Sequence, residues 1–189
     1  MRGQAKLLLL VVLAFVIITG LWASRTYNRL VSLHEQIPAA WSQVQNVLQR
    51  RNDLIPNLVA TVKGYAKHEQ TVFGAVTEAL KSFNRATTIP DQIAADNTIT
   101  GLLHQIMAIS LQYPNLKANE NFLRLQDEIA GTENRIAVER MRFNETVQAY
   151  NTTVKKFPTN LVARIGGFAP SENYFKAAES AQTAPQVQF

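Results

Sequence analysis

The pattern of hydrophobic and polar positions changes once along this chain, at Ser24. Before that point, Leu7–Ser24 form an uncharged run of 18 residues between Lys6 and Arg25. A helix of this composition has no polar face to present to water, and at about 1.5 Å per residue it extends for about 27 Å, close to the thickness of a bilayer's hydrocarbon core. A cleaved signal peptide usually has a shorter apolar region of about 7–15 residues. The run therefore predicts a single transmembrane anchor.

Beyond Ser24 the apolar residues recur at alternating steps of three and four, the spacing of helices that pack side by side as in a coiled coil. Four such stripes follow one another, at residues 41–65, 72–83, 95–113 and 122–154. The connections between them are short, which favours antiparallel neighbours. The pattern predicts an all-α protein in which the transmembrane helix is followed by an antiparallel up-down four-helix bundle with long first and last helices.

Residues that start or end helices stand between the stripes. Thr88 is suited to capping the third helix, with Pro90 in its first turn. Pro158 ends the fourth helix, because proline disfavours helix at the residue before it. Pro38 and Pro56 fall inside the first helical pattern, where each removes one backbone donor. We expect a kink at Pro56 and either a helix start or a kink near Pro38.

These elements divide the chain into an anchor with its N-terminal flank at 1–25, the bundle at 26–156 and a C-terminal extension at 157–189. The extension places aromatic residues among glycines and prolines. Because aromatic side chains are costly to leave in water, we expect the extension to pack on the bundle, with a short helix at Tyr174–Gln182.

The charges narrow the choice of partners and of membrane orientation. The net charge is +5, but the basic residues are scattered singly or in pairs, so no surface for nucleic acid is predicted. Arg2 and Lys6 precede the anchor, while Arg25 and Arg29, partly offset by Glu35, follow it. By the positive-inside rule this slight imbalance favours a cytoplasmic N-terminus. We expect a single-pass inner-membrane protein with an extracytoplasmic bundle.

The sequence contains none of the motifs that usually carry catalysis or bind a metal. It has no cysteine, no phosphate-binding G-x-x-x-x-G-K run and no glycine-flanked nucleophilic serine. None of the histidines, His34, His68 and His104, follows a glutamate at three residues or belongs to an H-E-x-x-H motif. We therefore predict no catalytic residue, no cofactor and no metal, and expect that the protein is not an enzyme.

Charged residues interrupt the apolar stripes. Arg51 and Arg140 stand where core residues are expected, and a lone buried charge is costly, so each needs a partner or must reach solvent. In an antiparallel pairing of the first and last helices, Arg51 lies near Glu145. The interpretations are an ion pair that sets helix register, a polar groove that receives a partner, and partial exposure. The candidate polar layer comprises Arg51, Asp53, Asn57, Glu139, Arg140 and Glu145.

A second group of charges is basic and belongs to the ends of the long helices nearest the anchor. If the bundle folds back toward the membrane, these residues gather there and face anionic lipid head groups. They are Arg25, Arg29, Lys155, Lys156 and Arg164.

Several segments of the chain resemble segments of the LemA family and follow one another in the same order as in that family. They are AWSQV (Ala40–Val44), RRNDLIPNLVATVKGYAKHE (Arg50–Glu69), YPNLKANENFLRLQDEI (Tyr113–Ile129), TENRIAVERMRFNETVQAYNT (Thr132–Thr152), FPTNLVA (Phe157–Ala163) and PQVQF (Pro185–Phe189). The resemblance implies a bacterial membrane protein with one N-terminal span and a helical-bundle body, and it supplies no catalytic residue. A related branch of the family takes part in magnetosome membranes.

Together these features predict a membrane-anchored, non-catalytic scaffold or interaction protein of the bacterial cell envelope. The alternative is a membrane-shaping protein that organises anionic lipid. The expected partners are the lipid bilayer, through Leu7–Ser24, and an unidentified membrane or envelope protein, with a homo-oligomer left open.

Overall fold

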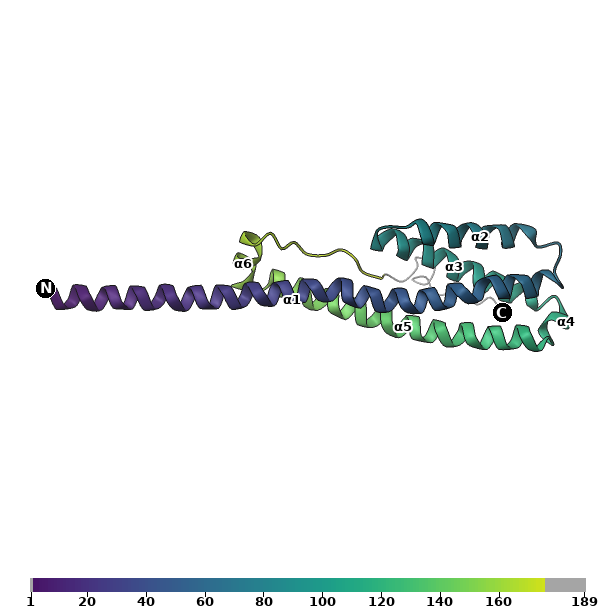
Figure 1. Cartoon of the computed structure of the whole chain (residues 1–189), viewed down its shortest axis with the longest axis horizontal. Helices are drawn as coiled ribbons and strands as arrows, with labels where there is room; N and C mark the ends of the chain where they lie inside the picture. Colours follow the sequence, from purple (N-terminus) through teal and green to yellow (C-terminus); the bar gives the residue numbers. More distant parts are fainter. Residues whose placement is uncertain (1, 176–189) are drawn as a thin grey trace, which may run out of the picture. The chain divides into compact units, whose positions relative to one another are not determined.

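A computed structural model describes residues 2–175, and within this range the chain is helical and contains no strand (Figure 1). The helices are α1 (Arg2–Lys63), α2 (Gln70–Arg85), α3 (Ile89–Ser110), α4 (Pro114–Lys117), α5 (Glu120–Lys155) and α6 (Thr159–Ile165). The all-α class is thus confirmed for the described residues, while the antiparallel four-helix bundle stays a prediction.

Helix α1 carries the apolar run at its N-terminal end. The large hydrophobic side chains of Leu7–Ile18 are between 51% and 69% exposed, which is the opposite of a core helix. Within the described residues, α1 is the helix whose length and composition suit it to crossing a membrane. The exposed apolar surface is what a bilayer covers, so the structure agrees with a transmembrane anchor.

Helix α1 continues through both prolines, so of the two alternatives near Pro38 the helix start is wrong. The kinks at Pro38 and Pro56 stay predictions. The rings of Pro38 and Pro56 both lie on the exposed side of α1. A proline within a helix removes one backbone hydrogen bond, and on the exposed side water can hydrate the carbonyl that has lost its donor. The packed stripe on the other side of α1 is therefore uninterrupted.

The other helix ends agree with the sequence in part. Thr88 caps α3 as predicted, with its Oγ1 accepting a hydrogen bond from the Asp91 N–H at 3.3 Å. The short helices α4 and α6 were not predicted, because four and seven residues are too few to show a helical period. In the helix expected at Tyr174–Gln182, Tyr174 and Phe175 are not helical, and the remainder lies outside the described residues.

The contacts within the chain define two compact units. The anchor unit comprises residues 2–39 and Glu145–Glu172, and the core unit comprises Ala40–Asn144 with residues 173–175. Both units contain parts of α1 and α5, because these helices are long. The expected boundaries of anchor, bundle and extension at 25/26 and 156/157 stay predictions.

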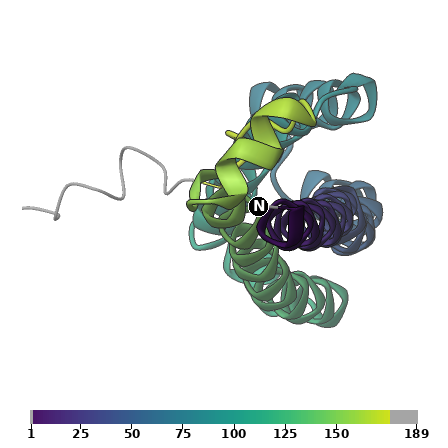
Figure 2. The same cartoon turned by 90° about the vertical axis from the view of Figure 1, so that its left-hand side faces the viewer.

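The core unit has a continuous hydrophobic interior. Its α2 and α3 pack against each other and lie side by side in both views (Figures 1 and 2). The predicted stripes supply the interior, since every fourth or third residue of each helix is removed from water. Its most deeply buried members include Leu48, Ile55 and Leu58 of α1, Phe73 of α2, Ile99 and Ile106 of α3, and Phe122 and Phe143 of α5.

The anchor unit is held together by the chain that follows α6. The ring of Phe168 meets the ring of Tyr27 edge-on, with the centroids 5.5 Å apart. The Asn151 side chain donates to the Ser171 carbonyl at 2.7 Å and accepts from the Ser171 N–H at 2.7 Å. Residues 168–171 therefore dock against α1 and α5 of this unit.

Two exposed helical glycines provide a first prediction. A Cβ added at Gly101 of α3 or at Gly131 of α5 would meet nothing within 4 Å. Because alanine restricts the unfolded chain and favours helix, Gly101→Ala and Gly131→Ala should each raise the free energy of unfolding by about 0.5–1 kcal/mol. Urea denaturation of the detergent-solubilised protein measures this. In the control Gly167→Ala, the φ of +76° is strained for alanine, so stability should fall.

Candidate functional site

One fully buried charge of the core unit is Arg51. Its burial agrees with its place in the apolar stripe of α1. Its Nη2 lies 2.5 Å from Asp96 Oδ1 of α3, and its Nη1 lies 2.7 Å from Glu133 Oε1 of α5. Nη1 also donates to Thr100 Oγ1 at 2.9 Å. One guanidinium thus joins three helices through charge-assisted hydrogen bonds.

Arg140 completes this network from α5. Its Nη2 donates to the second carboxylate oxygen of Asp96, which therefore receives an arginine on each side. The guanidinium carbon of Arg140 also lies 4.8 Å from the ring centroid of Phe175, a cation–π distance. The network thus links α1, α3 and α5 through paired opposite charges.

The structure corrects the predicted polar layer. The carboxylates that reach Arg51 are those of Asp96 and Glu133, so the proposed pairing with Glu145 is wrong. Glu145 is exposed and belongs to the anchor unit. The error has a physical reason: only the first and last helices were considered, while α3 places a fully buried carboxylate against Arg51.

The remaining members of that layer lie outside the buried network. Glu139 pairs with Arg142 one turn away at 2.7 Å, and not with Arg140. Asp53 is exposed and accepts a hydrogen bond from Gln49 at 2.7 Å. Asn57 is exposed as well. The buried network therefore consists of Arg51, Asp96, Thr100, Glu133 and Arg140.

Sequence reasoning missed Asp96, although a signal was present. Asp96 stands in an otherwise uncharged stretch of α3, from Gln92 to Gln105. With no basic residue three or four positions away, its partner had to come from another helix. The candidate partners were also visible in the sequence, since Arg51 and Arg140 occupy core positions of other helices.

An aromatic cluster lies beside the network. The ring of Trp41 is 5.3 Å from Phe143 and 5.6 Å from Phe175, measured between centroids. The Trp41 indole N–H donates to Gln92 Oε1 at 2.9 Å. Asn144 holds the backbone of Phe175 on both sides, accepting from its N–H at 2.9 Å and donating to its carbonyl at 3.0 Å. Phe175 is thereby fixed on the core unit.

A groove runs between α3 and α5 of the core unit, with a volume of about 320 Å³. Its apolar lining comes from Leu103 and Met107 of α3 and from Ile129 and Ala130 of α5. Polar side chains at the edge are His104, Gln126, Glu133 and Asn134. Since Glu133 also binds Arg51, the groove borders the buried network.

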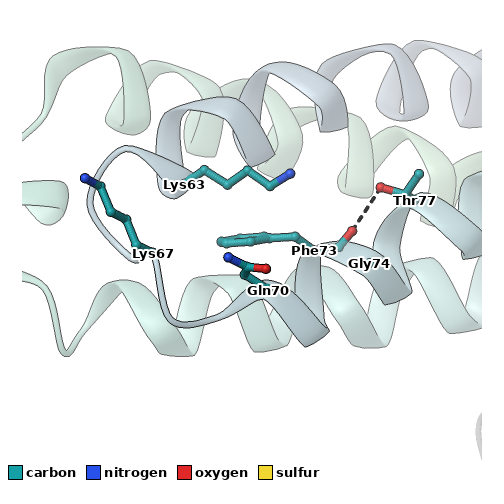
Figure 3. A pocket seen from close by; sticks show the side chains of 6 residues that line it. All are labelled: Lys63, Lys67, Gln70, Phe73, Gly74 and Thr77. Carbon is teal, nitrogen blue, oxygen red and sulfur yellow. Dashed lines mark hydrogen bonds between the residues drawn. The ribbon is translucent and has the colours of Figure 1, made fainter.

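A second pocket of about 480 Å³ opens where α1 passes into α2 (Figure 3). In Figure 3 the Lys63 side chain extends over the Phe73 ring, and its Nζ is 5.5 Å from the ring centroid. Lys67, Gln70, Gly74 and Thr77 complete the lining. These residues offer positive charge and hydrogen-bond donors, and no carboxylate or histidine is among them.

The basic residues predicted to gather near the membrane all belong to the anchor unit, and all five are exposed. Within residues 2–175 none of the five forms an ion pair. Two of them, Arg29 and Lys156, line one pocket of about 530 Å³ together with Trp22, Glu145 and Phe157. The anchor unit thus has a basic, partly aromatic pocket beside the end of the apolar run.

Comparison with known proteins identifies the chain's relatives. A model of the LemA family matches residues 40–189, which is most of the chain. The chain belongs to the LemA family. The match begins at the first residue of the core unit and leaves out the apolar run. The resemblance inferred from the sequence motifs is confirmed.

Individual relatives of this LemA-family chain align with it over different lengths, and the two MamQ proteins extend over the apolar run as well. "Magnetosome protein MamQ" of Magnetospirillum gryphiswaldense is 26% identical over 98% of this chain and 79% of the relative. "Magnetosome protein MamQ 2" of Paramagnetospirillum magneticum is 24% identical over 96% of this chain and 76% of the relative. "Protein LemA" of Metamycoplasma hominis is 26% identical over 72% of this chain and 63% of the relative.

These comparisons and the apolar α1 show a membrane-associated protein. Neither the LemA family description nor the names of the relatives assigns an enzymatic activity. Within the described residues, no group of three or more His, Asp or Glu side chains is arranged to hold a metal ion.

A buried phenol in the anchor unit provides a pH prediction. Burial raises the pKa of the Tyr150 hydroxyl above its usual value of 10.0, and the hydroxyl donates to the Ala169 carbonyl at 2.9 Å. The folded protein keeps this proton after the unfolded chain has lost it. The stabilisation is therefore complete below about pH 10 and is lost as the pH rises above it.

Urea midpoints measured from pH 8 to pH 11 test this effect. Tyr150→Phe should lower stability at pH 8 by about 1 kcal/mol, because it removes one hydrogen bond, and should lose less stability than the wild type above pH 10. The exposed Tyr65→Phe serves as the control and should keep the wild-type slope. Equal slopes for all three proteins would contradict the assignment to Tyr150.

Proposed function

We propose that this LemA-family protein is a membrane-anchored, non-catalytic scaffold of the bacterial envelope. In this proposal the core unit is an antiparallel four-helix bundle that binds a protein partner. The observation that carries it is the apolar groove between α3 and α5, together with the exposed apolar run of α1. The run fixes the chain in a bilayer, and the groove offers a surface on which a helix of another protein can dock.

The chemistry of the groove suits a helical partner. Leu103 and Ile129 are buried and form its floor, whereas Met107 is half-buried and Ala130 is exposed. A methionine side chain adapts its shape to different apolar partners, and a small residue such as alanine lets a partner approach closely. The polar edge of the groove can fix the partner's orientation by hydrogen bonds.

The relatives support a role at a membrane. The MamQ proteins are magnetosome proteins by name, and they align with nearly the whole of this chain, span included. From these names we carry over only a role at a membrane. The tethered binding surface is proposed from the groove and the apolar run of this chain.

Site-specific photocrosslinking in cells tests the scaffold function. A photoreactive amino acid at Met107 should give a crosslinked product of defined size, and the groove-filling variant Ala130→Trp should abolish it. The control places the same amino acid at Thr98, which is exposed on α3 but does not line the groove. Identical products from both positions, or products unchanged by Ala130→Trp, would contradict the proposal.

A second candidate function is the organisation of anionic lipid. The observation that favours it is the set of five exposed basic residues in the same unit as the span. Reconstitution of the full chain into vesicles tests it, with vesicle shape recorded by electron cryomicroscopy. The wild type should change vesicle shape only when anionic lipid is present, and replacing all five residues by glutamine should abolish the change. Unaltered vesicles in every case would exclude this function.

A further inference from the structure

The pocket beside the end of the span combines features that a lipid head group requires. It encloses about 530 Å³ and is lined by Trp22 and Arg29 of α1, Glu145 of α5, and Lys156 and Phe157 of the turn into α6. Small-molecule sites in proteins usually have volumes of about 300–1,000 Å³. The pocket is therefore large enough for a polar head group.

The depth of the pocket in the bilayer follows from Trp22. Trp22 belongs to the apolar run, two residues before its last residue, Ser24. Tryptophan at the end of a span lies at the level of the lipid head groups. Because Phe157 lines the same pocket, the turn between α5 and α6 lies at this level too. The pocket consequently opens where phospholipid head groups are present at high density.

The exposed surface of the same turn and of α6 is apolar. Phe157, Leu161 and Ile165 are 75%, 54% and 89% exposed. Their spacing of four residues puts Leu161 and Ile165 on one face of α6. Such a face is unfavourable in water and favourable in the interfacial region of a bilayer, where short amphipathic helices lie with apolar side chains among the acyl chains. The surroundings of the pocket are thus suited to lipid.

The charges of the pocket select the kind of head group. Arg29 and Lys156 form no ion pair within residues 2–175, and both are exposed. With Glu145, the lining carries a net charge of +1. Threonine hydroxyls at Thr152, Thr153 and Thr159 add neutral hydrogen-bonding groups. A head group with one phosphodiester charge and free hydroxyls matches this arrangement, whereas a zwitterionic one leaves one positive charge unmatched.

We propose that this pocket binds one phospholipid whose head group pairs a phosphodiester with hydroxyl groups, as phosphatidylglycerol does. Arg29 and Lys156 donate to the phosphodiester oxygens, and Glu145 accepts from a head-group hydroxyl. Trp22 and Phe157 border the glycerol backbone and the first acyl carbons. Because this inference rests on the contact of the anchor unit with anionic lipid, its test has to separate a defined site from a general basic surface.

Native mass spectrometry of the full chain, released from nanodiscs of equal phosphatidylglycerol and phosphatidylethanolamine, makes this separation. The wild type should retain one phosphatidylglycerol in preference to phosphatidylethanolamine. Arg29→Gln with Lys156→Gln should reduce this preference about tenfold or more, because two charge-assisted bonds are lost. The matched control is Arg25→Gln with Lys155→Gln, which removes the same charge from exposed residues outside the pocket lining.

The outcomes have distinct meanings. A preference lost in the pocket variant and kept in the control supports the site. An equal loss in both overturns the site while leaving a general basic surface, and no preference in the wild type overturns the site and the contact with anionic lipid together. The variant Glu145→Gln is a further test, and it should keep the wild-type preference for phosphatidylglycerol. A wild type that prefers phosphatidylethanolamine, and loses that preference in Glu145→Gln, would identify an ammonium head group and overturn the proposal.

Discussion

Replacing Asp96 with alanine is expected to lower the free energy of unfolding by about 3–5 kcal/mol. The substitution removes the carboxylate that accepts hydrogen bonds from both Arg51 and Arg140. Arg51 keeps Glu133 and Thr100, but it is fully buried and loses its closest counter-charge. Urea denaturation of the detergent-solubilised protein, followed by circular dichroism, measures the change.

Two further variants show whether the loss arises from an unbalanced buried charge. Asp53→Ala removes an exposed carboxylate of α1 and should change stability by less than about 0.5 kcal/mol. Arg51→Met combined with Asp96→Leu replaces the closest pair with apolar side chains and should be more stable than Asp96→Ala alone. A double variant as unstable as Asp96→Ala would mean that the charges themselves stabilise the fold.

Trp41→Ala should destabilise the core unit to a similar degree, by about 3–5 kcal/mol. Trp41 is 5% exposed and contacts the rings of both Phe143 and Phe175. Its removal leaves a cavity, takes a donor from Gln92, and deprives Phe175 of its stacked partner. Thermal unfolding followed by circular dichroism gives the size of the effect.

Trp41→Phe is the matched control, because it keeps an aromatic ring and removes the indole N–H. Its cost should be clearly smaller, about 1–2 kcal/mol. The chain has two tryptophans, so Trp22→Phe leaves Trp41 as the one fluorescent reporter of this cluster. In that background, Phe175→Ala should shift the emission of Trp41 to longer wavelength, and an unshifted spectrum would show that Phe175 does not cover the indole.

The sequence was sufficient for those parts of the fold that depend on repeated spacing. The stripes of α1, α2, α3 and α5 each repeat the helical spacing many times. One polar residue within a stripe therefore does not change the prediction of a helix. Thr88 was predictable for a different reason, since a threonine before Pro90 has one evident function at a helix start. Helices α4 and α6 have no such repetition, because four and seven residues make at most about two turns.

For the candidate sites too, local sequence patterns could be interpreted in advance, whereas contacts between distant residues could not. That Arg51 needed a counter-charge followed from its place in the stripe, but its partner depended on which helix lies against it. Asp96 is 45 residues away in sequence, and no local pattern links the two. That Arg25 and Arg29 lie close to the apolar run follows from their positions in the sequence, whereas the contact of the basic group with lipid stays a prediction. The pocket itself could not be predicted, since it depends on the turn before α6.

The burial of Arg51 also has a consequence for biosynthesis. Glu133 is 82 residues later in the chain, so at about 5–20 residues per second the ribosome completes it about 4–16 seconds after Arg51. During that interval the apolar stripe of α1 is newly made, close to an insertion machinery that has just received Leu7–Ser24. An arginine at the centre of a helix opposes insertion by about 2.5–3.5 kcal/mol. Arg51 shares this effect with Arg50 and Asp53 beside it, so the charges at the centre of this part of α1 oppose its insertion during the interval before Asp96 and Glu133 have been made.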